Sequence, residues 1–191
     1  GKMKATILFA SPRPNGNTAQ MKDVFIKELE EKNWDITYFN LYDLEINPCI
    51  ACRKCQEDWD NFYCIYKDDM YPIADDIMTS DLIVIMTPIY YCTPPMKALM
   101  DRLVYGMCKY YGEEVGPSLV KGKKVCALVT CGYRPEKGSD LFLEGLKRYC
   151  KHTGMEYLGD ISLRHLGYKT VFWDEEKEKV TKEFAESIIN M

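Results

Sequence analysis

The N-terminal segment 5–21 constrains the fold of this chain more than any other stretch. It begins with the apolar and β-branched run Ala5-Thr-Ile-Leu-Phe-Ala, which is typical of a strand buried on both faces. It ends as an amphipathic helix with one apolar stripe, formed by Met21, Val24, Phe25 and Leu29. A strand, a short polar loop and a helix in this order leave backbone N–H groups free at a helix N-terminus, where the helix dipole favours an anion.

The loop between strand and helix carries side chains that are able to bind phosphate oxygens. Its sequence offers hydroxyls, amides and one guanidinium, the last able to bind phosphate in a planar fork. The loop lacks the glycine spacing of dinucleotide folds and the lysine of nucleoside-triphosphate loops, and it has no cysteine to act as a phosphatase nucleophile. An ordinary capped turn is the alternative, with Asn17 or Thr18 as the cap. We therefore predict that the loop binds a terminal phosphate monoester through Ser11, Arg13, Asn15, Gly16, Asn17 and Thr18.

The rest of the chain alternates between strand and helix patterns. Strands are expected at 35–41, 81–87, 123–130 and 156–163, and helices at 71–80, 95–106, 138–153 and 175–190. This alternation predicts an α/β fold with a doubly wound, five-stranded parallel sheet in the order 2-1-3-4-5 and helices on both faces. We expect a single domain over residues 1–191, with a cysteine-rich insertion at about 45–70.

In this strand order, ligands bind beyond the carboxyl ends of the strands, at the switch point between the first and third. The segment after the third strand, Thr87-Pro-Ile-Tyr-Tyr-Cys-Thr-Pro-Pro95, combines rigid prolines with aromatics that can stack on a flat ring. The segment after the fourth strand, Thr130-Cys-Gly-Tyr133, has a glycine that permits close backbone approach. Both are also compatible with ordinary core packing.

The loop Ser11-Pro-Arg13-Pro-Asn-Gly16-Asn17-Thr18 resembles the FMN-phosphate loop of flavodoxin-like NAD(P)H-dependent FMN reductases, in particular their iron–sulfur flavoprotein branch. Gly16 stands where that branch often has a serine. The resemblance implies that the flavin ring lies along Pro88, Ile89, Tyr90 and Tyr91, and that Thr130, Cys131 and Gly132 flank its edge. His152 and His165 lack metal-ligand spacing, and neither is expected to act as a ligand or base.

Four cysteines form the remaining signal. Cys49, Cys52 and Cys55 follow one another at three-residue spacing, and Cys64 comes after a further eight residues rich in aromatics. Three thiolates at this spacing can bind one metal ion or one small cluster, and a fourth thiolate from further along the chain can complete the set of ligands. Zinc modules more often use two separated pairs. The segment resembles the compact cysteine motif of iron–sulfur flavoproteins, although its last gap is longer. A 4Fe–4S cluster near the flavin is one expectation, and structural or redox-sensing thiols are the other.

Composition narrows the class of protein. The formal net charge of -4 argues against a nucleic-acid partner. No apolar run is long enough to span a bilayer, no signal-peptide pattern is visible, and nine cysteines in an untargeted chain favour a reducing compartment, so we expect a cytoplasmic protein.

The resemblance implies an FMN-dependent oxidoreductase that takes hydride from NAD(P)H and passes electrons to a quinone, a flavin or another acceptor. A non-enzymatic electron carrier and a thiol-based redox sensor are the alternatives. Aromatic residues outside the expected strands predict a homodimer or homotetramer; they are Trp59, Phe62, Tyr63, Tyr66, Tyr105, Tyr110 and Tyr111.

Overall fold

The computed structural model describes residues 1–90, 94–167 and 169–191. Its centre is a parallel sheet in the order β2-β1-β3-β4-β5, as predicted. The strands are β1 (Lys4–Phe9), β2 (Asp35–Asn40), β3 (Leu82–Ile89), β4 (Lys124–Cys131) and β5 (Glu156–Arg164). The helices are α1 (Asn17–Glu31), α2 (Met70–Thr79), α3 (Pro94–Met107), α4 (Asp140–Thr153) and α5 (Glu175–Ile189). Every expected element is present within two residues of its expected bounds.

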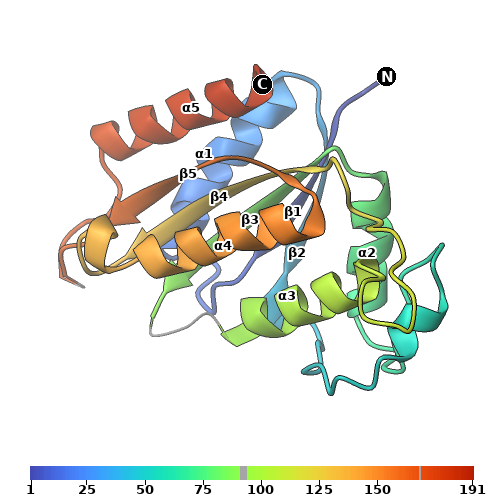
Figure 1. Ribbon diagram of the computed structural model, residues 1–191. Coiled ribbons are helices and arrows are strands. Elements are labelled where there is room, and N and C mark those ends of the chain that lie inside the picture. The colour runs from blue at the N-terminus through green and yellow to red at the C-terminus, as the bar shows by residue number, and fades with distance from the viewer. Residues whose placement is uncertain (91–93, 168) are drawn as a thin grey trace.

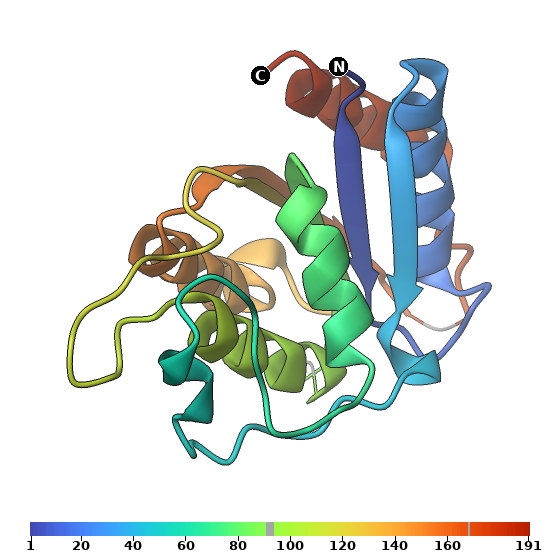
Figure 2. The same ribbon diagram turned by 90° about the vertical axis from the view of Figure 1, so that its right-hand side faces the viewer.

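Helices cover both faces of the sheet, α1 and α5 on one and α2, α3 and α4 on the other (Figure 1, Figure 2). Successive residues of the central strands therefore alternate between two cores, so that Leu8 packs among α2 and α3 while Ile7 and Phe9 pack among α1 and α5. Burial on both faces explains why β1, β3 and β4 read as nearly continuous apolar runs. The more polar β2 and β5 lie at the two edges.

Parallel pairing brings the carboxyl ends of the strands to one edge of the sheet. Phe9 lies opposite Met86, and Pro88 and Ile89 lie opposite Thr130 and Cys131. The β3 strand runs two residues further than expected, so Pro88 and Ile89 belong to its end and not to a loop. The segments that follow β1, β3 and β4 meet at this edge.

The helices α5 and α1 begin in different ways, one with a side-chain cap and one without. Asp174 caps α5 by accepting a hydrogen bond from the backbone N–H of Lys177 at 2.8 Å. The alternative of an ordinary turn capped by Asn17 or Thr18 is not what the structure shows, because both residues lie within the first turn of α1 and Gly16 takes the cap position. Among the described residues, no side chain caps this helix end.

The cysteine-rich segment connects β2 to α2 on the outside of α3 (Figure 1). Its regular structure is limited to two short 3-10 helices, η1 (Leu41–Asp43) and η2 (Lys54–Glu57). In the part of the chain that the structure describes, no helix is both long and apolar enough to cross a membrane.

Candidate functional site

A cavity of about 420 Å³ opens at the carboxyl edge of the sheet. This volume falls in the usual range for small-molecule and cofactor sites. Ten of the residues predicted to bind the cofactor line it: Ser11, Arg13, Asn17, Thr18, Pro88, Ile89, Tyr90, Thr130, Cys131 and Gly132. The three segments singled out from the sequence therefore meet at one cavity.

The phosphate-loop candidate is a compact turn that leads into α1. The backbone N–H of Arg13 donates to the Ser11 hydroxyl at 3.3 Å, and the N–H of Gly16 donates to the Arg13 carbonyl at 3.2 Å. The uncapped first turn of α1 follows directly. Backbone N–H groups of a first turn have no partner within the helix, so this end can bind an anion.

A hydroxyl pair joins the first loop to the end of β4. Thr18 and Thr130 are both buried, and their side-chain oxygens lie 3.0 Å apart across the sheet edge. Next to them, burial raises the pKa of the Cys131 thiol, so this side chain stays neutral at pH 7. The cavity floor is thus a set of neutral polar groups, and its formal positive charge comes from Arg13 at the entrance.

Not every predicted residue lines this cavity. Asn15 is exposed on the turn, and Gly16 lies against the Arg13 side chain. Tyr91 lies outside the described residues. Their roles in binding remain predictions.

Three further residues line the cavity beyond those predicted to bind: Tyr133, His165 and Gly167. His165 follows the carboxyl end of β5, and its backbone N–H donates to the Cys131 carbonyl at 2.9 Å. Their place in the sequence could have predicted this, because they follow the fourth and fifth strands, which end at the same edge of the sheet.

A second, smaller cavity of about 130 Å³ lies beside the C-terminal half of α3. All four cysteines of the cysteine-rich segment line it, namely Cys49, Cys52, Cys55 and Cys64. Arg102, Tyr105 and Gly106 form the α3 wall. The sequence prediction that the fourth cysteine joins the first three is therefore supported by their common cavity, despite the longer gap before it.

The backbone bends sharply around Cys52. Its neighbours Ala51 and Arg53 have φ angles of 54° and 62°, in the left-handed region that side chains other than glycine rarely adopt. Within this bend the backbone N–H of Ala51 donates to the Cys49 sulfur at 3.4 Å. The Gln56 side chain donates to the Cys55 sulfur at 3.3 Å. Burial raises the pKa of the Cys55 thiol, and the hydrogen bond from Gln56 offsets part of that rise.

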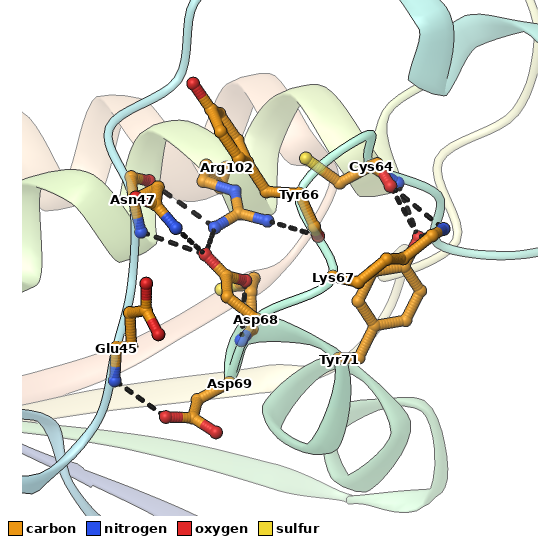
Figure 3. A network of polar contacts seen from close by, with 10 residues as sticks. Glu45, Asn47, Cys64, Tyr66, Lys67, Asp68, Asp69, Tyr71 and Arg102 are labelled. Atoms are coloured by element: carbon orange, nitrogen blue, oxygen red, sulfur yellow. Dashed lines mark hydrogen bonds and ion pairs between the residues drawn. The ribbon is translucent and has the colours of Figure 1, made fainter.

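A buried ion pair holds the two ends of the segment together (Figure 3). The side chains of Arg102 and Asp68 are 1% and 4% exposed, and Nη1 of Arg102 donates to the Asp68 carboxylate. The same carboxylate accepts from the backbone and side-chain N–H groups of Asn47, each at 2.9 Å. Arg102 also donates to the Tyr66 carbonyl at 3.4 Å. Burial opposes the Asp68 charge, but Arg102 and Asn47 outweigh it and lower the pKa of Asp68 to about 2.

A buried lysine anchors the middle of the segment. Lys109 is 0% exposed, and its ammonium donates to the carbonyls of Cys55, Asn61 and Gly106 at 2.6–2.9 Å. Gln56 adds a second anchor by donating to the Tyr105 carbonyl at 2.7 Å. Arg102 and Lys109 thus place one cation near Cys64 and another near Cys55.

The cysteines surround the cavity without closing on one point. No three histidine, cysteine or carboxylate side chains among the described residues are arranged to hold a single metal ion. A four-iron cluster is a larger body with a thiolate at each corner, and a cavity with four cysteines on its walls suits it better.

One polar atom in the wall of the cysteine cavity has no partner. Nε of Arg102 is buried and makes no hydrogen bond to any residue that the structure describes. An N–H group in this state is rare in proteins and is expected to gain a partner when the cavity is occupied. An anionic, sulfur-rich group fits both this orphaned donor and the two cations.

The two cavities share no lining residue. Sequence reasoning missed Arg102 and Lys109. A signal for Arg102 was available, because it falls on the apolar stripe of α3 beside Leu99 and Leu103, where an arginine needs a partner.

Comparison with known proteins assigns the family. A family model described as having a flavodoxin-like fold matches residues 3–189. The chain belongs to this family. The resemblance seen in the phosphate-loop sequence is therefore confirmed, and so is the predicted fold.

Curated relatives extend the likeness to the iron–sulfur branch. The chain is 31% identical over 121 residues to an iron–sulfur flavoprotein of Archaeoglobus fulgidus, covering 62% of this chain and 54% of that protein. It is 28% identical over 180 residues to an iron–sulfur flavoprotein of Methanocaldococcus jannaschii, covering 93% of this chain and 85% of that protein. The first match thus spans about half of its relative's length.

Among solved structures, an NAD(P)H:quinone oxidoreductase from Methanothermobacter marburgensis superposes with a TM-score of 0.69 at 17% identity. The match covers 97% of this chain and 94% of that one. At this identity the likeness shows the shared fold.

Proposed function

We propose that this protein is an FMN-dependent oxidoreductase that oxidises NAD(P)H. The observation that carries the proposal is the cavity at the carboxyl edge of the sheet, where an uncapped helix N-terminus, Arg13 and the ends of β3 and β4 meet. A relative of the same fold that is named as an NAD(P)H:quinone oxidoreductase supports the choice of electron donor. FMN, when bound, supplies the hydride acceptor and the electron-transfer chemistry.

The residues of the chain bind and orient. Backbone N–H groups of the first turn of α1 and the Arg13 guanidinium hold the phosphate, with Ser11 and Thr18 as further donors. Pro88 and Ile89, held in register by β3 and β4, form a rigid wall for a flat ring. Gly132 has open space where a Cβ would stand, so a ligand can approach its backbone closely.

The first experiment measures FMN and FAD binding to the flavin-free protein. Arg13→Ala should weaken FMN by about 1.5–3 kcal/mol, because a charge-assisted hydrogen bond is lost. Arg148→Ala is the matched control, since Arg148 is an exposed arginine of α4 outside the cavity. Equal FMN affinity in Arg13→Ala and the parent would place the phosphate elsewhere.

Steady-state turnover separates an enzyme from the alternatives. An oxidoreductase consumes NADH or NADPH in the presence of a quinone or free flavin at a rate proportional to bound FMN. An electron carrier or a thiol sensor binds its group but shows no such turnover. Trials with both nicotinamides and several acceptors would also define the substrate pair.

We further propose that Cys49, Cys52, Cys55 and Cys64 hold a 4Fe–4S cluster. The supporting observations are their common cavity, its two neighbouring cations and the names of the iron–sulfur relatives. Anaerobically reconstituted protein should contain about four iron and four sulfide per chain. Cys52→Ala should lose the iron and keep FMN, whereas Cys150→Ala, which alters a buried core cysteine, should keep both. Reconstitution that leaves the parent without iron would reduce the four cysteines to structural or redox-sensing roles.

The homodimer or homotetramer expected from the aromatic residues stays a prediction. Phe62 does not support it, because its ring is buried against Tyr71 in the same chain. Trp59, Tyr63 and Tyr105 are exposed and available for such a contact. Light scattering at micromolar concentration measures the mass directly, and an active monomer would contradict the expectation.

A further inference from the structure

The wall of the cysteine cavity contains a donor that the fold itself does not use. Arg102 is 2% exposed, yet only its Nη atoms are hydrogen-bonded, to Asp68, Asn47 and Tyr66. Its Nε has no partner among the described residues. An unsatisfied N–H of a buried charged group costs free energy, so this N–H is expected to gain an acceptor when the cavity is occupied.

The neighbourhood of Nε indicates which acceptor it meets. Arg102 and Cys64 line the same cavity, and the Cys64 side chain turns toward Arg102 in Figure 3. The Cys49 and Cys55 sulfurs on the other walls already accept N–H hydrogen bonds from Ala51 and Gln56.

We infer that Arg102 is a positioning residue for the iron–sulfur site, and that its free Nε–H donates to the Cys64 thiolate of the bound cluster. This inference rests on the proposed cluster. It extends to Cys64 the pattern of N–H···S bonds seen at Cys49 and Cys55. Hydrogen bonds to the sulfurs are one of the factors that set the reduction potential of such clusters.

The expected consequence has a definite sign. Reduction adds one electron to the cluster and neither forms nor breaks a bond, so the reduced state carries one more negative charge. A donor beside a ligand sulfur stabilises that state and raises the potential. Losing the donor should therefore shift the one-electron equilibrium toward the oxidised cluster by about tenfold, which corresponds to 59 mV.

The test must separate this donor from the anchoring role of the Arg102–Asp68 pair. The double variant Arg102→Met/Asp68→Asn removes both charges together, and the asparagine oxygen can still accept from Asn47. Asp68→Asn alone keeps the donor and removes a negative charge. Anaerobic titration with dithionite and redox mediators, read from the cluster's absorbance and its electron paramagnetic resonance signal, gives the potential of each protein after normalisation to iron content.

The inference predicts opposite shifts, with a potential below that of the parent in the double variant and above it in Asp68→Asn. If the Arg102–Asp68 pair were purely structural, the variants would lose iron or stability, and their reduction potentials would not shift in opposite directions. A double variant that retains iron and titrates within twofold of the parent would overturn the inference while leaving the cluster in place. A parent protein that takes up no iron would overturn both.

Loss of iron from the double variant calls for a second arginine variant. Arg102→Lys keeps a positive charge against Asp68 but has no Nε, and it should again lower the potential. If both Arg102 variants lose iron while Asp68→Asn retains it, Arg102 contacts the cluster itself, as inferred. If all three lose iron, Arg102 serves the anchor alone and the inference fails.

Discussion

The two cavities of this protein are built in different ways. The cavity at the carboxyl edge of the sheet is bounded by strand ends and a helix N-terminus that the hydrogen bonds of the sheet already fix. The cysteine cavity is bounded by an irregular segment that is fixed by a few side chains, chiefly Arg102, Asp68 and Lys109. Substitutions at the first should therefore change ligand binding more than stability, and substitutions at the second should change stability strongly.

The largest effect is expected from breaking the buried ion pair. Asp68→Ala leaves the Arg102 charge buried without its counter-charge and should lower the free energy of unfolding by about 3–5 kcal/mol. Urea unfolding measures this loss. Glu144→Ala, which removes an exposed partner of Arg148, is the control and should change stability by less than about 1 kcal/mol. Similar values for the two variants would mean that the ion pair does not hold the segment.

The second-largest effect on stability is expected from adding one methyl group to α3, where it faces the cysteine-rich segment. A Cβ at Gly106 would overlap the Phe62 ring, so Gly106→Ala should destabilise the protein by roughly 1–3 kcal/mol. Gly145→Ala in α4 is the matched control, because nothing lies within 4 Å of its added Cβ. This control should gain about 0.5–1 kcal/mol from better helix propensity. Thermal unfolding of both variants tests the opposite signs.

Acid should loosen the cysteine segment through Asp68. Its pKa is lowered to about 2 in the folded protein, so it contributes stability that is present above about pH 4 and lost as the pH falls toward 2. The contribution lost is about 2 kcal/mol. The free energy of unfolding of the parent minus that of Asp68→Asn should shrink over this pH window. A constant difference between pH 5 and pH 2 would contradict the assigned ion pair.

The smallest effect on stability is expected at the flavin cavity. Gly132→Ala places a methyl group in open space, so unfolding of the flavin-free protein should change by less than about 0.5 kcal/mol. The same methyl group should weaken FMN by about 1 kcal/mol, or roughly fivefold, if the ring approaches this backbone. Fluorescence titration measures the affinity. If Gly132→Ala lost stability but kept its FMN affinity, the expected difference between the sheet-edge cavity and the cysteine cavity would be contradicted.

The same contrast explains what could be read from the sequence. The strands and the edge cavity follow from local patterns, since apolar runs such as that of β3 specify the sheet and the sheet brings Thr18 beside Thr130. The cysteine-rich segment is held in place by contacts between residues far apart in the chain. Arg102 and Asp68, for example, are separated by 34 positions. No spacing rule connects them. The cysteine pattern indicated which residues gather, but not how the chain holds them.

The network around Asp68 also closes a loop, which has a consequence for how a cluster would be inserted. Asn47 and Asp68 are 21 positions apart and hydrogen-bonded, and the four cysteines lie between them. Bringing the ends of such a loop together costs roughly 2.7 kcal/mol of chain entropy. In zinc fingers the metal must supply this cost, and those domains are unfolded without it. Here the Asn47–Asp68 hydrogen bonds and the Asp68–Arg102 ion pair offset part of this cost within the polypeptide itself, so less of it remains for the cluster than for the metal of a zinc finger.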